Sequence, residues 1–227
     1  MNNNLKDNDV QSTEIKFYKS TFEKISEDRR QKILDVAIAE FAANGYNGTN
    51  INVITKKAGI STGAMYSYFA SKEDLFLTIV DLGYKLLEDA IKEIDVDGMD
   101  VFAAYERLLH ITRDYAQQYP QMNQIYLDST TQGLKNLSSR LSNKMESITA
   151  KYYMKALKKA KENQLISKDT DERLASFCMD NLIVMFQFSF TSEYYKERLR
   201  IFLGENALED EEKIIQGIMQ FVRKALA

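Results

Sequence analysis

The stretch Ala58–Leu75, AGISTGAMYSYFASKEDL, decides the fold of this chain. It holds two glycines and two tyrosines, and its first acidic residue is Glu73. Gly59 allows the left-handed backbone that a tight turn requires, because glycine has no Cβ to clash. Ser61 or Thr62 can then cap a new helix by accepting hydrogen bonds from its first backbone N–H groups. The stretch therefore predicts two short helices joined by a glycine turn.

A longer helix is predicted before this pair. Ser26 precedes Glu27 and Asp28, an arrangement typical of a capping residue with acids in the first turn of a helix. Apolar residues then recur at spacings of three and four until Asn44 and Gly45 end the run. With short helices over residues 51–58 and 62–68, this order predicts a helix-turn-helix domain.

The ordered run over residues 30–75, RQKILDVAIAEFAANGYNGTNINVITKKAGISTGAMYSYFASKEDL, resembles the N-terminal DNA-binding domain of the TetR family of bacterial transcriptional regulators. The likeness includes the FAANGYNGTN bend, AGIS at the turn, TGAMYSYF as recognition helix and SKEDL at the start of the next helix. The remaining residues resemble the family only in helical character and length.

The resemblance implies a dimer whose two recognition helices enter successive major grooves of double-stranded operator DNA. Carried over by motif position, phosphate contacts are implied for Thr49, Asn50, Tyr66, Tyr68 and Lys72, and groove contacts for Ser61, Thr62, Gly63 and Ser67. Tyrosine hydroxyls can donate to phosphate oxygens, and a lysine at a helix N-terminus adds charge where anions are already favoured.

This chain departs from the family pattern at the start of the recognition helix. Thr62 and Ala64 stand where many members carry a lysine and a polar or leucine side chain. The set of base contacts is therefore small, and sequence readout depends on a few contacts or on DNA shape. The two tyrosines also have a plainer interpretation as core residues.

The distribution of charge is compatible with a DNA partner. The net charge of −3 alone argues against nucleic acid, since DNA-binding proteins usually carry a basic surplus. Residues 1–72, however, carry ten Lys and Arg against eight Asp and Glu, and no acid occurs between Phe41 and Lys72. That window can approach phosphates without repulsion.

Several classes of function are disfavoured by composition. Cys178 is the only cysteine and His110 the only histidine, which excludes a disulfide framework and any metal site built from several Cys or His ligands. His110 follows Glu106 by four residues, with no second copy of the pair as a carboxylate-bridged metal bundle requires. No phosphate loop, nucleophile elbow or dinucleotide fingerprint occurs. We expect no enzyme and no cofactor, with His110 a satisfied helix residue and Cys178 a small core hydrophobe.

The chain start and the apolar runs predict a cytoplasmic location. The first sixteen residues, MNNNLKDNDVQSTEIK, are polar throughout and do not resemble a signal peptide. The most apolar run, Leu182–Phe190, is too short to span a bilayer. We therefore expect no membrane partner.

The whole chain is predicted to be all-α, because it has one proline and nine glycines and is rich in helix-forming residues. We predict about nine helices by apolar periodicity. We expect a partly disordered extension over 1–25, whose Phe17, Phe22 and Ile25 can pack on the next domain, a helix-turn-helix domain over 26–72 and a helical effector-binding and dimerisation domain over 73–227. The later helices are predicted over 73–98, 101–118, 121–129, 134–157, 171–199 and 209–227.

The predicted helix over 171–199 is apolar almost all round at Leu182–Phe186 and Phe188–Phe190. A helix tolerates this only if it is buried on more than one side. The resemblance implies a homodimer through the last two helices, which would cover the second side. A single large core is the alternative.

A small-molecule pocket is a weaker inference from methionines and aromatic residues, which suit adaptable apolar binding. The candidates between the fifth and eighth helices are Phe102, Tyr105, Leu109, Met122, Tyr126, Met145, Tyr152, Met185 and Phe186. An ordinary core is the plainer interpretation of the same residues. If a ligand binds, we expect an apolar or amphipathic molecule of low charge.

These observations suggest a ligand-responsive DNA-binding transcriptional regulator, a repressor released from its operator by a small effector. Effector binding would move the fourth helix and change the separation of the two recognition helices. The alternative is a helical adaptor whose N-terminal domain contacts a protein partner.

Overall fold

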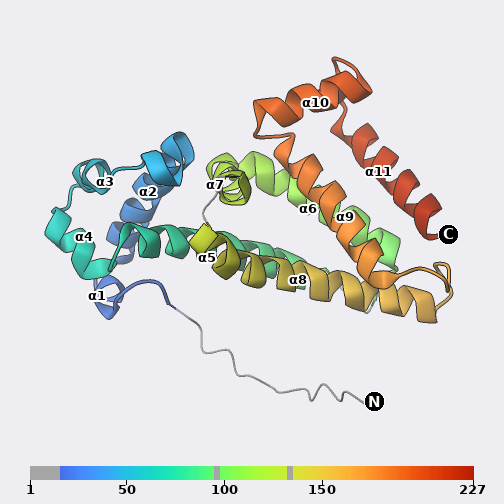
Figure 1. The fold of residues 1–227 in the computed structure, drawn as a ribbon, viewed down its shortest axis with the longest axis horizontal. Coiled ribbons are helices and arrows are strands. Elements are labelled where there is room, and N and C mark those ends of the chain that lie inside the picture. The colour runs from blue at the N-terminus through green and yellow to red at the C-terminus, as the bar shows by residue number, and fades with distance from the viewer. Residues whose placement is uncertain (1–15, 95–97, 132–134) are drawn as a thin grey trace, which may run out of the picture.

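A computed structural model describes residues 16–94, 98–131 and 135–227, with the side chains of 131–148 outside the described part (Figure 1). The described residues form only helices and connecting turns, which confirms the all-α prediction. The α-helices are α1 (Ser20–Glu23), α2 (Glu27–Gly48), α3 (Ile51–Ala58), α4 (Thr62–Tyr68), α5 (Lys72–Lys92), α6 (Val101–Gln118), α7 (Pro120–Thr131), α8 (Lys135–Glu162), α9 (Glu172–Phe188), α10 (Glu193–Leu203) and α11 (Glu211–Leu226), with a short 3₁₀ turn, η1, at Ala207–Glu209.

The predicted glycine turn and the Ser61 cap form, whereas Ser26 occupies the N-cap position of α2 without a side-chain cap hydrogen bond. Gly59 has φ 72° and ends α3 in the left-handed conformation. The side chain of Asn50 accepts a hydrogen bond from the Asn52 backbone N–H at the start of α3, and the Ser61 side chain accepts one from the Ala64 N–H at the start of α4. The start of α3, the end of α3 and the start of α4 are thus determined by a local hydrogen bond or a glycine.

The predicted end of the first long helix is a kink. Gly45 has φ 64° and interrupts α2, and one further turn carries the chain to Thr49. The Phe76 ring of α5 packs on the inner side of this corner. Its centroid lies 5.1 Å from that of Phe41 and 5.0 Å from that of Tyr46.

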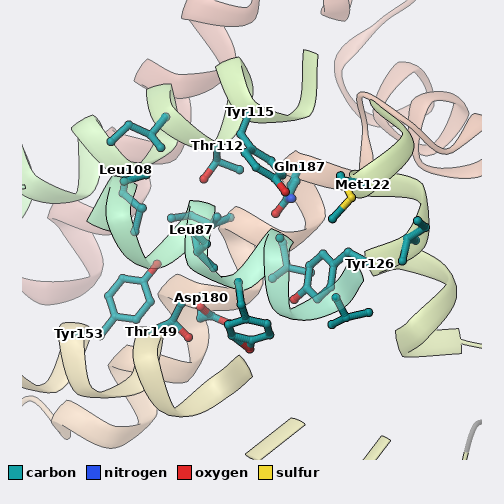
Figure 2. A pocket seen from close by; sticks show the side chains of 18 residues that line it. Leu87, Leu108, Thr112, Tyr115, Met122, Tyr126, Thr149, Tyr153, Asp180 and Gln187 are labelled. Atoms are coloured by element: carbon teal, nitrogen blue, oxygen red, sulfur yellow. The ribbon is translucent and has the colours of Figure 1, made fainter. Parts of the chain in front are cut away.

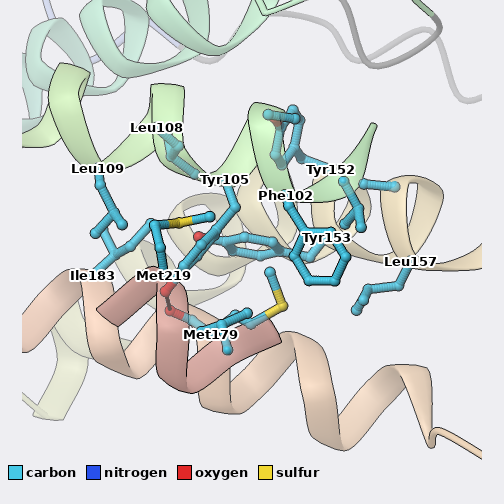
Figure 3. Packing of buried hydrophobic residues seen from close by; sticks show 14 of the residues in the cluster. Phe102, Tyr105, Leu108, Leu109, Tyr152, Tyr153, Leu157, Met179, Ile183 and Met219 are labelled. Carbon is cyan, nitrogen blue, oxygen red and sulfur yellow. Dashed lines mark hydrogen bonds between the residues drawn. The ribbon is translucent and has the colours of Figure 1, made fainter. Parts of the chain in front are cut away.

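Two clusters of buried apolar residues lie along the chain. The first cluster contains residues of α1, α2, α3, α4 and the first half of α5, from Phe22 to Tyr84, together with Ile125 of α7. The second joins α6, α8, α9 and α11 (Figure 3). In it the Tyr105 hydroxyl donates to the Met179 backbone oxygen at 2.8 Å, which ties α6 to α9. The first cluster contains residues from both sides of each predicted domain boundary, 25/26 and 72/73. It does not separate the predicted domains, so these boundaries stay predictions.

The helix predicted over 171–199 is wrong as one element. It divides into α9 and α10, whose axes meet at 108°. No glycine or proline marks the break. At the end of α9, side chains donate hydrogen bonds to backbone carbonyls and so compete with the backbone N–H groups that would continue the helix. Ser189 Oγ donates to the Met185 oxygen at 2.9 Å, and Asn123 Nδ2 of α7 donates to the Gln187 oxygen at 3.2 Å. A tertiary contact with α7 thus accompanies the bend.

The long helix predicted over 73–98 is also shorter in the structure, because α5 ends at Lys92, with residues 95–97 outside the described part.

Within the described residues no single helix is long and apolar enough to cross a membrane. Only α9 and α10 taken together reach that length and composition, and they are sharply bent against each other.

Candidate nucleic-acid interface and apolar cavity

The outer face of α4 carries most of the side chains predicted to contact DNA. Ser61, Thr62, Gly63, Tyr66 and Ser67 are all exposed, whereas Met65, Tyr68 and Phe69 are buried beneath them. Tyr66 is 46% exposed, which is high for so large an aromatic side chain. A seven-residue helix with a polar outer face and an apolar inner face is thus presented to the surrounding water.

The hydroxyl groups on this face are held by short-range hydrogen bonds. Thr62 Oγ1 lies 3.2 Å from Asn52 Oδ1, which links α4 to the start of α3, and Ser67 Oγ donates to the Ala64 oxygen at 2.7 Å. Asn52 is exposed and belongs to this face, although the sequence pattern did not indicate it. Its signal was its place in the first turn of α3, two residues after the capping residue Asn50.

Gly63 has no packing reason within the chain to be glycine. A Cβ built on it would meet only Ser61 Oγ, at 3.9 Å, and its φ lies outside the left-handed range. The absence of a side chain therefore matters only for what approaches α4 from outside.

Burial argues against two of the predicted phosphate contacts. Thr49 is 4% exposed, and its hydroxyl donates to the backbone oxygens of Glu40 and Gly45, where it stabilises the corner between α2 and α3. Tyr68 is 7% exposed, and its ring packs 5.7 Å from Phe22. Because both side chains are almost fully buried, a phosphate contact is disfavoured for each and stays a prediction.

Lys72 has structural partners of its own. Its ammonium donates to the backbone oxygens of Tyr46 at 2.8 Å and Thr49 at 3.1 Å, and lies 4.6 Å from the centroid of the Tyr46 ring. Lys72 thus fastens the start of α5 to the corner after α2. Its phosphate contact stays a prediction.

Residues 19–21 cap the C-terminal end of α4. The last carbonyls of a helix lack intrahelical partners, and here three in succession are satisfied from outside. The Lys19 backbone N–H donates to the Tyr68 oxygen at 2.8 Å, Lys19 Nζ to the Tyr66 oxygen at 2.7 Å, and Thr21 Oγ1 to the Ser67 oxygen. We call Lys19–Thr21 the N-terminal clamp.

Phe22 anchors the N-terminal clamp. Its side chain is buried, and its ring lies 4.8 Å from that of Phe69, just beyond the end of α4. The expected packing of Phe22 on the next domain is therefore confirmed. The clamp itself was missed, since hydrogen bonds to the end of α4 leave no pattern in a polar segment.

An apolar cavity of about 100 Å³ lies between α5, α6, α7, α8 and α9 (Figure 2). Figure 2 shows Tyr115, Met122 and Gln187 gathered on one side of it, and Tyr153, Thr149 and Asp180 on another. The lining residues are Val80, Gly83, Tyr84, Leu87, Ala90, Leu108, Ile111, Thr112, Tyr115, Met122, Ile125, Tyr126, Thr149, Tyr153, Asp180, Ile183, Val184 and Gln187.

Two tyrosines of the cavity, the partly buried Tyr115 and the buried Tyr153, stay protonated at neutral pH. Burial raises the pKa of Tyr115 to about 12 and that of Tyr153 well above its ordinary value. The Tyr153 hydroxyl has no hydrogen-bond partner among the described residues. An unsatisfied buried hydroxyl is costly, so a ligand with an acceptor atom would find a ready donor there.

The cavity is lined by two of the predicted ligand residues, and the others lie elsewhere or outside the described side chains. Met122 and Tyr126 line it. Four others lie in the second core: Phe102, Tyr105, Leu109 and Tyr152. A separate groove is lined by Met185 and Phe186, and the side chain of Met145 is outside the described residues. On α6 the cavity is faced by Leu108, Ile111, Thr112 and Tyr115, which were not predicted from the sequence. Since α6 is apolar on two faces, periodicity alone did not indicate which face borders the cavity.

A second apolar surface lies over α9, α10 and α11. A groove of about 260 Å³ runs between these helices, lined by residues including Met185, Leu199 and Ile218. Large side chains are exposed on all three helices, namely Leu174, Phe177, Tyr194, Ile201, Phe202, Leu203 and Phe221. Cys178 is also exposed here, which corrects its predicted place in the core, since it shares the outer side of α9 with Phe177.

Comparison with known proteins agrees with this geometry. Residues 33–79 match the sequence profile of the family described as bacterial regulatory proteins, tetR family. The HTH-type transcriptional regulator AcrR of Shigella flexneri is 38% identical over 92 residues, which cover 38% of this chain and 41% of AcrR. The matches to two further curated regulators also cover less than half of each relative's length.

Solved structures share the fold over most of the chain. A TetR family transcriptional regulator from Chloroflexus aurantiacus has a TM-score of 0.69 at 20% identity, covering 92% of this chain and 98% of that one. FadR of Bacillus subtilis, solved in complex with stearoyl-CoA, has a TM-score of 0.64 at 16% identity, covering 83% and 97%. At these identities the likeness shows the fold alone.

The capped turn and the polar outer face of α4 define a helix-turn-helix DNA-binding domain. Residues 33–79 of this domain match the tetR-family profile, and the chain as a whole has the fold of TetR-family regulators. The matched relatives are transcriptional regulators and not enzymes.

Proposed function

We propose that this protein is a ligand-responsive transcriptional regulator, a repressor that leaves its operator when a small apolar or amphipathic effector binds. The observation that carries the proposal is the outer face of α4. It presents Thr62, Tyr66 and Ser67 on a helix whose inner face is buried, beside an exposed Asn50 at the start of α3. Hydroxyl and amide groups of this kind contact phosphates and base edges in the major groove.

Two helices connect the cavity to the DNA-binding domain. α5 begins at Lys72 beside the α2–α3 corner and reaches the cavity at Val80 and Leu87. α7 lines the cavity with Met122 and Ile125, and both side chains also pack on the first core. A ligand that pushes these helices apart would therefore shift the base of the recognition helix.

The size of the cavity favours such a movement. Its volume of about 100 Å³ is well below the roughly 300 Å³ at which small-molecule sites begin. α5 and α7 approach closely beside it, since a Cβ on Gly83 would lie 2.9 Å from Met122 Cε. An effector of ordinary size would bind only after the helices separate, so binding and movement would be coupled.

The exposed apolar side chains of α9 and α11 support a homodimer through these helices. Phe177 is 67% exposed and Phe221 is 62% exposed, and contact with a second copy would remove both from water. A twofold dimer would present two α4 helices to two half-sites about one helical turn of DNA apart.

The experiment is a titration of purified protein against labelled DNA that flanks its own gene, at physiological salt, with unrelated DNA of equal length as competitor. Binding that survives the competitor supports a site-specific regulator and supplies an assay for effectors. Binding equal to that of the competitor at every flanking site, with a folded dimer in solution, would overturn the operator proposal and favour the helical adaptor.

A further inference from the structure

Three side chains that can bind a metal ion meet where α6 packs on α11. Glu106 and His110 lie one turn apart on α6, and Glu212 is in the first turn of α11. One ligand atom from each lies within 4.8 Å of the other two, and His110 Nδ1 is 3.9 Å from Glu212 Oε2. Residues four apart on a helix share a face, so the backbone already aims Glu106 and His110 in the same direction.

Gln216 bridges the two carboxylates with one amide group. Its Nε2 donates to Glu106 Oε1 at 3.0 Å and to Glu212 Oε1 at 2.9 Å. Two carboxylates that share a site repel each other, and a neutral amide offsets that repulsion only in part. A divalent cation at the same place would neutralise both. The Gln216 amide can then turn to present its carbonyl oxygen, because an amide carries a donor and an acceptor.

We propose that Glu106, His110 and Glu212 bind a first-row divalent transition ion, for which Zn²⁺ is the probe. One imidazole and two carboxylates match the donors that Zn²⁺ takes, whereas Mg²⁺ and Ca²⁺ prefer oxygen alone. Tetrahedral bonds of about 2.0–2.2 Å place ligand atoms roughly 3.4 Å apart. Rotation of partly exposed side chains can close the present separation without moving either helix.

Arg113 opposes the ion and so tunes the site. One of its guanidinium nitrogens lies 3.9 Å from Glu212 Oε2, close enough to repel a cation. The guanidinium also pairs with Asp114 at 2.8 Å and with Glu211 at 3.7 Å. It therefore keeps two anionic partners when Glu212 turns to a metal.

The site would fasten α6 to α11. α6 lines the apolar cavity with the two residues after His110, Ile111 and Thr112, while α11 borders the groove at Ile214 and Ile218. An ion that binds only the folded chain stabilises it and holds these two helices together. The metal site depends on these side chains alone and not on the proposed binding of DNA.

The experiment uses untagged full-length protein with Cys178→Ser, so that the exposed thiol does not bind the probe. After dialysis against chelator, Zn²⁺ is titrated by calorimetry and Co²⁺ by NMR. Because His110 is the only histidine, its imidazole C–H signals are unique, and paramagnetic Co²⁺ must shift or broaden them at stoichiometric amounts. We expect one Zn²⁺ per chain.

The variants separate coordination from general attraction to acids. His110→Gln and Glu212→Gln should each weaken Zn²⁺ at least tenfold, the lower range for lost metal-site interactions. Arg113→Gln should tighten it, and Glu205→Gln, an exposed acid outside the site, should change nothing. Absence of saturable Zn²⁺ binding, or equal affinity in His110→Gln, would overturn the proposal.

Discussion

Two surfaces of this protein leave large side chains in water, and they do so with opposite chemistry. On α4 the exposed groups are hydroxyls, a glycine and Tyr66, whose phenol carries a polar tip. On α9, α10 and α11 they are mainly hydrocarbon, at Phe177, Phe221 and the run Ile201–Leu203, together with Tyr194. The first surface remains well solvated until a polar partner arrives, whereas the second loses free energy in water until an apolar partner covers it.

This contrast indicates that the two surfaces act through different interactions. Contacts on α4 would be directional hydrogen bonds that select among DNA sites. Contacts on α9 and α11 would be area-dependent and would set the number of chains in the assembly. A substitution on α4 should therefore leave the number of chains in the assembly measurable, and one on α9 or α11 should leave DNA binding measurable. The comparison of the two surfaces is testable for this reason.

The largest effect is expected from Phe177→Glu with Phe221→Glu. Charges on both helices should give monomers, and operator affinity should fall by about 10²–10⁴, since two linked recognition helices gain that much over one. Analytical ultracentrifugation and the DNA titration measure both quantities. Leu165→Glu, an exposed apolar residue outside this surface, is the control. A double variant that stays dimeric would place the interface elsewhere.

The next effect compares two tyrosines of the same helix. Tyr66→Phe should weaken operator binding by roughly tenfold or more, because a hydrogen bond to a charged phosphate contributes about 1.5–3 kcal/mol. Tyr68→Phe should leave affinity unchanged, since that side chain is buried. DNA titrations of the two variants at one salt concentration provide the measurement. Equal losses in both would mean that the Tyr68 hydroxyl reaches DNA after all.

Gly63→Ala should separate folding from binding. Its new Cβ meets nothing closer than 3.9 Å within the chain, so thermal stability should hold or rise, by up to about 1 kcal/mol of helix propensity. Operator affinity should fall by about tenfold, the lower range for one lost base contact. Thermal unfolding and DNA titration are run on the same preparation. Unchanged affinity would show that DNA does not approach α4 at Gly63.

The smallest effect is expected from Lys19→Met. This change removes one cap of α4 and a positive charge near its C-terminus, which is worth about 0.3–1 kcal/mol, or up to roughly fivefold in affinity. Because Lys19 is proposed to position α4, the salt dependence of binding should keep its slope. A decrease of about 0.9 in that slope would instead make Lys19 a phosphate contact. Lys24→Met, an exposed lysine of the same segment, is the control.

Helix boundaries in the N-terminal half were predictable because each depends on a few neighbouring residues. Gly59, Asn50 and Ser61 act within one turn of their own positions. The N-terminal clamp was not predictable in this way, because Lys19 meets Tyr66 across 47 positions of sequence. The same holds for the partners of Lys72, which lie on the preceding corner.

In the C-terminal half, apolar periodicity predicted helices but not their neighbours. The bend between α9 and α10 is held through Asn123 of α7, and the cavity faces Leu108 instead of the adjacent Leu109. Neighbouring residues on a helix differ by about 100° in direction, so a small error in orientation exchanges core for cavity.

The amino-acid sequence by itself determined that this protein is helical and that two short helices meet at a glycine turn after a longer helix, since caps, glycines and apolar spacing act locally. Only the tertiary structure decided which apolar faces enclose the cavity, which lysines hold carbonyls, and where Glu106, His110 and Glu212 meet. Those features depend on the packing of elements far apart in the chain, and packing is settled by the shape of the whole core.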